Sequence, residues 1–343
     1  MRTLTYGQAL HEALSFAMEK DPSVFVMGIG VDDHKAVFGS TKNLVDRFGK
    51  ERVFDTPIAE AGMTGVAIGA ALGGMKPVHI HIRTDFLFLA MDQIFNIAAK
   101  WHYMFGGQMS VPIVIRAVIG RSWGQGAQHS QSLQSLFMHI PGIKVVMPTT
   151  AYDAKGLLLS AIFDPNPVVM IEHRLLYDVL GEVPEAYYEM PFGKTIVRKT
   201  GKDLTIVANS YMVVECLKAA EFLAERGIDV EIVDPVSLVP LDKKPIFDSV
   251  KKTGRLLLVD TSWVTCGVSA EIAALVAEEA FYALTQPVKR IGMQSVPCPV
   301  SKPLENAFYP SAKTIVEAVC KMMEKEVPDV EVPLLLSKFK GPF

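Results

Sequence analysis

A single histidine, His129, lies in a polar, glycine-containing loop, residues 121–132, that reads RSWGQGAQHSQS. The loop glycines would allow a ligand to approach the backbone closely. An imidazole changes its charge near neutral pH, so His129 could stabilise charge or shuttle protons. The alternative, that His129 only forms hydrogen bonds with its neighbours, stays open at this point.

A second candidate, Glu60, begins a small-residue helical segment within residues 55–74, DTPIAEAGMTGVAIGAALGG. Each helical glycine costs about 1 kcal/mol relative to alanine, which a helix tolerates where another backbone must approach. Burial against such a helix would raise the pKa of a carboxyl group, which could then share a proton with a nitrogen base. The glycines follow at spacings of three and four and therefore share one helix face: Gly62, Gly65, Gly69 and Gly73.

His79 and His81 alternate on an expected strand, so both rings would point to one face and could bind a metal. The sequence offers no evident third ligand. Arg83, Asp85 and Phe86 follow at the carboxyl end of this strand, where ligands bind in open α/β sheets.

Motifs for nucleotide binding are absent or incomplete. The pair Gly28 and Gly30 lacks the third glycine of a dinucleotide fingerprint, because Asp33 occupies that place. No phosphate-binding G-x-x-x-x-G-K-[ST] loop occurs.

Composition narrows the class of protein further. The 343 residues are 50% hydrophobic and carry a net charge of only −3, which argues against a nucleic-acid partner. No apolar run reaches the ~18 residues needed to cross a bilayer, and no signal peptide is evident. The four cysteines are dispersed, without a disulfide or zinc pattern. We expect a cytoplasmic protein with no membrane contact.

Short β-branched runs alternate with helical segments, which predicts α/β architecture with largely parallel sheets. Expected strands lie at 24–30, 77–82, 112–120, 143–148, 167–173, 203–208, 229–234, 255–260 and 287–293. Expected helices lie near 60–74, 86–105, 131–139, 151–163, 212–226, 242–252, 268–284 and 312–325. Residues 174–200 lack a sustained period and suggest a linker. We predict domains at 1–180 and 201–327, a linker at 181–200 and a tail at 328–343.

Together these motifs resemble a family. The segments 55–74, AMDQIFNIAAK (90–100), GAQHSQS (126–132), 139–162 and DTSWVTCGVSAEI (260–272) occur in the order found in beta subunits of thiamine-diphosphate-dependent 2-oxo acid dehydrogenases. These subunits belong to the decarboxylating first component of pyruvate, branched-chain 2-oxo acid and acetoin dehydrogenase complexes. The resemblance implies a pyrimidine-binding domain, with helices on both faces of its sheet, followed by a transketolase C-terminal domain.

Position by position, the resemblance implies roles for several residues. Glu60 matches the glutamate that hydrogen-bonds the cofactor's aminopyrimidine, Phe86 the aromatic residue packed against that ring, and His129 the histidine at the reacting thiazolium end. It also implies decarboxylation of a 2-oxo acid and transfer of the acyl group to a lipoyl acyltransferase. Positions that bind structural potassium in some members match Ile113, Ala161, Ile162, Asp164 and Asn166.

The family class binds diphosphate and Mg²⁺ through a Gly-Asp-Gly motif, which this chain lacks. The resemblance therefore implies that a separate alpha subunit supplies those ligands within an α2β2 heterotetramer. The chain also departs from the family at Ile80, in the Ser295–Pro297 segment and in Arg121–Gln125. Within the last of these, we expect Arg121–Trp123 to set substrate preference.

Two alternatives remain. The chain could be the C-terminal half of a split transketolase or a deoxyxylulose-phosphate synthase-like enzyme, for which Arg83, Arg116 and Arg121 are the candidate phosphate ligands. It could instead be a non-catalytic scaffold, although the presence of both Glu60 and His129 argues against that.

Overall fold

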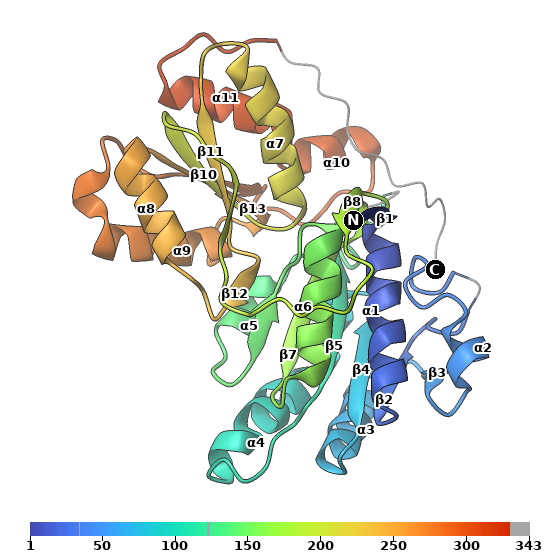
Figure 1. Cartoon of the computed structure of the whole chain (residues 1–343). Coiled ribbons are helices and arrows are strands. Elements are labelled where there is room, and N and C mark those ends of the chain that lie inside the picture. Colours follow the sequence, from blue (N-terminus) through green and yellow to red (C-terminus); the bar gives the residue numbers. More distant parts are fainter. Residues whose placement is uncertain (34, 122–123, 330–343) are drawn as a thin grey trace.

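The computed structural model describes residues 1–33, 35–121 and 124–329. It contains a seven-stranded sheet, a five-stranded sheet and a two-stranded ribbon. Figure 1 shows the larger sheet with α1 and α6 in front of it, and the smaller sheet beside it with α7, α8, α9 and α11 around it. The predicted α/β architecture is confirmed.

The seven-stranded sheet has the order β12-β6-β7-β5-β4-β2-β3. All neighbouring strands pair in parallel except β12, which is antiparallel to β6. The carboxyl ends of the parallel strands therefore meet at one edge. The strands are β2 (Val24–Gly28), β3 (Val53–Asp55), β4 (Lys76–His81), β5 (Val114–Ile119), β6 (Lys144–Val146), β7 (Val168–His173) and β12 (Ser237–Val239).

Helices cover both faces of this sheet, because alternate apolar strand residues enter two different cores. One core holds Leu10 and Leu158 with Val26 and Val114, and the other holds Ile68 and Leu87 with Met27 and Ile115. The helices of the first core are α1 (Tyr6–Lys20) and α6 (Ala151–Phe163), and those of the second are α3 (Glu60–Leu72), η1 (Thr84–Ala90), η2 (Gln93–Ala98), α4 (Ala99–Met104) and α5 (Gln134–Met138). The short α2 (Leu44–Phe48) precedes β3.

The five-stranded sheet has the order β14-β13-β10-β11-β9, with only β9 antiparallel. Its strands are β9 (Ile196–Lys199), β10 (Leu204–Ala208), β11 (Val230–Asp234), β13 (Leu256–Trp263) and β14 (Lys289–Met293). Its helices are α7 (Tyr211–Ala224), α8 (Lys244–Thr253), α9 (Val268–Glu279), η4 (Phe281–Ala283), α10 (Lys302–Phe308) and α11 (Ala312–Met322).

The segment predicted as a linker contains strand residues of β8 (Leu180–Val183) and β9. After η3 (Arg174–Leu176), β8 pairs antiparallel with β1 (Arg2–Thr5), and β9 joins the smaller sheet. In addition, β12 belongs to the larger sheet although it follows β11 in the chain. The two halves are thus joined by strand pairing as well as by the covalent chain.

The sequence pattern was wrong in detail at some helices. The single helix predicted near 86–105 is a 3₁₀ turn, a π-helical segment and the short α4 in succession. The pattern also missed α1, whose Thr5 and Gln8 form a capping box at its start. Of the predicted tail, residues 330–343 lie outside the described residues. No helix in the described ranges is long and apolar enough to cross a membrane.

Candidate active site

Glu60, Phe86 and His129 all follow carboxyl ends of strands in the larger sheet. Glu60 begins α3 after β3, Phe86 lies in η1 after β4, and His129 lies in the loop after β5. Because these strands are parallel, all three residues belong to the same edge, where an open α/β sheet binds ligands.

Phe86 and His129 are in direct contact. Their rings meet edge to face with centroids 5.2 Å apart. Asp85 anchors the loop beside them: its Oδ1 accepts hydrogen bonds from the Gln131 backbone N–H at 3.2 Å and side-chain amide at 2.9 Å. Burial raises the pKa of Asp85, while the bonds from Gln131 oppose that rise. The sequence pattern did not predict that Asp85 anchors this loop. The only signal in the sequence was a carboxylate residue at the carboxyl end of a strand.

Glu60 is 7% exposed as a residue, and its side chain makes no hydrogen bond or ion pair within the part of the chain that the structure describes. Neither carboxylate oxygen is among the fully buried atoms that lack a partner, so the group is open to a ligand from outside this chain. These side chains fit an aminopyrimidine: the carboxylate can bond a ring nitrogen, and Phe86 offers an aromatic face. Phe86 is nearby because η1 packs against α3.

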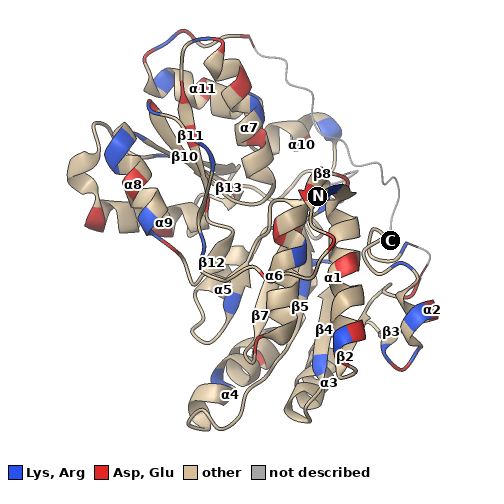
Figure 2. Cartoon of the chain, in the orientation of Figure 1, with Lys and Arg blue, Asp and Glu red and all other residues tan. Residues whose placement is uncertain are grey.

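The glycine face of α3, formed by Gly62, Gly65 and Gly69, is uncovered. A Cβ built on Gly62 or Gly69 would meet no described atom within 4 Å. The neighbouring Ile58 and Val66 are 81% and 58% exposed. Figure 2 shows few charged residues on α3 and α4. The close packing that the glycines predict therefore has no partner among the described residues of this chain.

His79 and His81 are buried and contact each other, with His81 Nε2 3.2 Å from His79 Nδ1. Burial lowers the pKa of His79 to about 4. The hydroxyl of Thr64 lies 3.5 Å from the same Nδ1. Among the described residues, no group of three metal-binding side chains occurs, so the pair is best explained as a neutral element of the core.

The five potassium candidates lie where β5 begins and α6 ends, and oxygens of three of them already accept hydrogen bonds. Asp164 Oδ1 accepts from Lys144 Nζ and from the Asn166 N–H, each at 2.8 Å. The carbonyl of Ile113 accepts from Val168 N–H at 3.0 Å, and that of Ala161 from Asp164 N–H at 3.3 Å. Ile162 is buried beside them.

The segment after His129 is fixed to the smaller domain. Gln134 Nε2 donates to Asp260 Oδ1 at 2.8 Å, and Ser262 Oγ donates to the Ser132 carbonyl at 2.9 Å. These contacts, which sequence reasoning did not identify, let the second domain position the loop that carries His129. Of the segment expected to set substrate preference, Ser122 and Trp123 lie outside the described residues.

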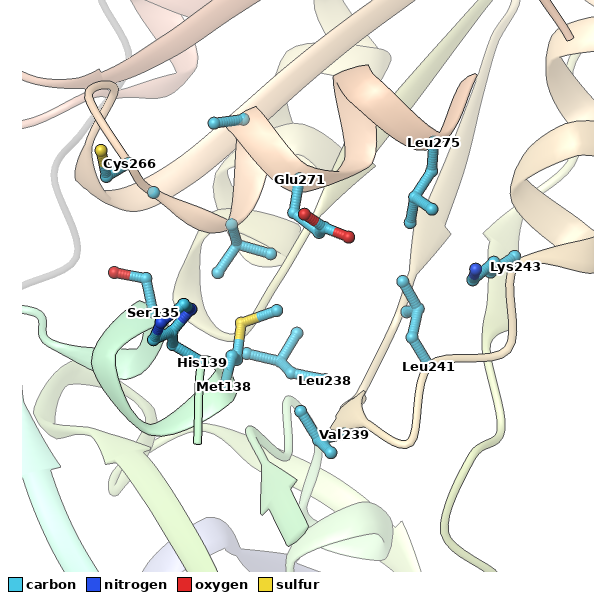
Figure 3. A pocket seen from close by; sticks show the side chains of 13 residues that line it. Ser135, Met138, His139, Leu238, Val239, Leu241, Lys243, Cys266, Glu271 and Leu275 are labelled. Carbon is cyan, nitrogen blue, oxygen red and sulfur yellow. The ribbon is translucent and has the colours of Figure 1, made fainter. Parts of the chain in front are cut away.

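A separate cavity of about 420 Å³ lies between α5, the β12 region and α9. Figure 3 shows His139, Lys243, Cys266 and Glu271 around it. None of Glu60, Phe86 or His129 lines this cavity, so it is distinct from the candidate active site.

The fold and this sheet-edge site define a transketolase-like protein. Residues 2–179 match the transketolase pyrimidine binding domain and residues 193–315 match the transketolase C-terminal domain. More particularly, the chain belongs to the family of beta subunits found in pyruvate dehydrogenase E1 components and in acetoin oxidoreductases.

Three relatives illustrate this family. The acetoin:2,6-dichlorophenolindophenol oxidoreductase subunit beta of Bacillus subtilis is 43% identical, over 94% of this chain and 98% of the relative. The mitochondrial pyruvate dehydrogenase E1 component subunit beta-2 of rice is 43% identical, over 95% of this chain and 88% of the relative. A solved structure described as a split gene transketolase, inactive beta4 tetramer, has a TM-score of 0.74 at 25% identity and covers 94% of this chain and 98% of that one.

Proposed function

We propose that this chain is the beta subunit of a thiamine-diphosphate-dependent 2-oxo acid or acetoin dehydrogenase and supplies one half of an active site. Glu60 carries this proposal. Its carboxylate has no partner among the described residues and is open to a ligand, at the sheet edge that also presents Phe86 and His129.

Each residue would have a defined task. Glu60 would hold a proton against the aminopyrimidine, and Phe86 would pack on the ring. His129, kept in place by Phe86 and by the Asp85–Gln131 anchor, would stabilise charge at the reacting end. When bound, thiamine diphosphate supplies a nucleophilic carbon that stores electrons as carbon dioxide leaves.

An alpha subunit would complete the site within an α2β2 heterotetramer, because this chain lacks the Gly-Asp-Gly motif for diphosphate and Mg²⁺. The uncovered glycine face of α3 and exposed Ile58 supply a surface suited to such a partner. We further propose a lipoyl acyltransferase as the acyl acceptor and the cytoplasm as the location. Structural potassium at Asp164 would have to displace the ammonium of Lys144 or share the carboxylate with it.

The test is reconstitution with the co-expressed alpha-type chain. The assembled protein, given thiamine diphosphate, Mg²⁺ and dichlorophenolindophenol, should oxidise a 2-oxo acid or acetoin, while this chain alone should not. Turnover by the isolated chain would contradict the need for a partner. Absence of turnover over a broad substrate panel, with assembly and cofactor binding intact, would contradict the dehydrogenase assignment.

A second candidate is half of a split transketolase, favoured by the likeness to the solved split gene transketolase. Transfer of a two-carbon unit to an aldose acceptor, without need for an electron acceptor, would select it.

A further inference from the structure

A group of arginines lies at the same sheet edge, beside the candidate active site. Arg83 follows β4, Arg121 follows β5 and Arg174 follows β7. Strand β5 pairs with both neighbours, placing Ala117 beside His81 and Ile119 beside His173. The three arginines are therefore close in space although far apart in sequence.

Arg83 has an unusual environment. It is 1% exposed, and both its terminal nitrogens lack a hydrogen-bond partner within the described ranges. Burial lowers the pKa of Arg83 to about 10, so the side chain is still a cation near neutral pH. A buried cation without an acceptor is strongly unfavourable, which indicates an anionic partner from outside this chain.

The other two arginines donate hydrogen bonds to neutral amide oxygens. Arg121 donates to the neutral amide oxygen of Asn306 at 3.3 Å, and Arg174 donates to Gln125 Oε1 at 3.2 Å. Arg174 loses affinity for its proton through burial first and then through the charge of Arg83, so its pKa falls to about 9. By contrast Arg116, the third sequence candidate for phosphate, is paired with Glu172 through its Nε and one terminal nitrogen.

Two carboxyl groups interact with Arg83 and Arg121. Asp85 is engaged by Gln131, and Glu305 is buried near Arg121. Burial raises the pKa of both carboxyl groups. Neither carboxyl group accepts a hydrogen bond from the terminal nitrogens of Arg83.

The arginines adjoin the catalytic loop at several points. Gln125, the partner of Arg174, lies in the loop that carries His129. The guanidinium of Arg121 lies over the ring of Tyr309, 5.4 Å from its centroid, and the Tyr309 hydroxyl donates to the carbonyl of Ser130 at 3.4 Å. An anion bound here would be next to the reacting centre but separate from Glu60.

We propose that Arg83, Arg121 and Arg174 bind a second anionic group of the substrate, so that the preferred substrate is a 2-oxo compound with a carboxylate or phosphate remote from its reacting carbonyl. This inference rests on the proposed function and specifies its substrate class. Planar guanidinium groups bind both carboxylate and phosphate oxygens, so the two sources are separated by experiment.

The activity arm uses the assembled enzyme and matched substrate pairs. 2-Oxoglutarate is compared with uncharged-tail 2-oxovalerate, and phosphohydroxypyruvate with hydroxypyruvate. In at least one pair kcat/KM should favour the anionic member by about 30-fold or more, and Arg83→Met should abolish that preference while retaining turnover of the uncharged member. The favoured pair identifies the anion. Equal kcat/KM within both pairs, or a preference that survives Arg83→Met, would overturn the proposal.

The binding arm uses the full chain and does not depend on turnover. Inorganic phosphate or glutarate should raise the Tm of the wild-type chain by several degrees and that of Arg83→Met by much less. Without anion, Arg83→Met should have a Tm equal to or above that of wild type, because an uncompensated buried charge is removed. Arg121→Met provides a second, less buried variant, and Arg226→Met, in the turn after α7, is the remote control.

The two arms distinguish this inference from the proposed function. If anions stabilise the protein through Arg83 but the enzyme oxidises no 2-oxo acid, the anion site is supported and the dehydrogenase assignment is rejected. Dehydrogenase activity without anion preference, and without stabilisation that depends on Arg83, would reject the site alone.

Discussion

The rings of Phe86 and His129 meet edge to face, with centroids 5.2 Å apart and planes at 77°. This contact joins the loop after β5 to the turn after β4, so His129 is held by the aromatic residue that we propose contacts the cofactor. The orientation of His129 should therefore depend on Phe86.

Replacing Phe86 with alanine should lower kcat of the assembled enzyme by about 100-fold, because a displacement near 1 Å at a reacting centre costs that much. The Kd for thiamine diphosphate should also rise. Steady-state oxidation with a dye acceptor and fluorescence titration measure the two effects. Phe281→Ala, on the remote and exposed η4, is the control. Unchanged kcat and Kd in Phe86→Ala would contradict the role of this ring.

Glu60→Gln should reduce kcat by about 10² to 10⁴, the usual contribution of a positioned acid–base group. The variant keeps the size of the side chain but cannot hold a proton against the pyrimidine. Size-exclusion chromatography should show normal assembly, and Glu278→Gln on the exposed part of α9 should keep full activity. Wild-type kcat in Glu60→Gln would remove Glu60 from the mechanism.

The glycine face of α3 should be needed for assembly rather than for the stability of this chain. Gly69→Leu should leave the free energy of unfolding of the isolated chain unchanged or slightly raised, since its Cβ meets no described atom. It should abolish co-purification with the alpha-type chain. Gly69→Ala, the matched small substitution, should impair assembly less. Normal assembly of Gly69→Leu would show that the partner binds elsewhere.

The ion pair of Arg116 and Glu172 has both side chains fully buried, with Nε 2.6 Å from Oε1. Glu172→Gln should lower the free energy of unfolding by about 3–5 kcal/mol, because it leaves a buried guanidinium uncompensated. Urea denaturation measures this loss. The double variant Arg116→Met/Glu172→Met should be less destabilised than the single one; an equal or larger loss would mean that packing, and not charge, dominates.

Stability should fall as the pH decreases from about 6.5 to 4. Burial lowers the pKa of His79 to about 4, below its unfolded value near 6.5, so the unfolded state binds the proton first. Each such histidine lowers the free energy of unfolding by about 1.4 kcal/mol for every pH unit that the pH falls within that window. Urea titrations at several pH values should show a smaller slope for His79→Gln, and no change for exposed His102→Gln. Parallel pH curves for wild type and His79→Gln would contradict this origin.

Much of the fold follows from local pattern. The buried β-branched runs predicted β2, β4, β5 and β7 within one or two residues, because parallel strands are apolar on both faces. The short strands β3, β9 and β12 were not recognised, since a strand of three or four residues has too little pattern. β12 in particular is defined only by its pairing with distant β6.

For the candidate site, the sequence by itself determined residue types and the motifs around Glu60, Phe86 and His129, because chemistry and family resemblance depend on identity and order. Only the tertiary structure decided which groups are neighbours and which lack partners. It paired Arg116 with Glu172 and left Arg83 buried without an acceptor within the described chain. The physical reason is that burial and hydrogen bonding depend on strand register and on loops from distant parts of the chain, which no local pattern encodes.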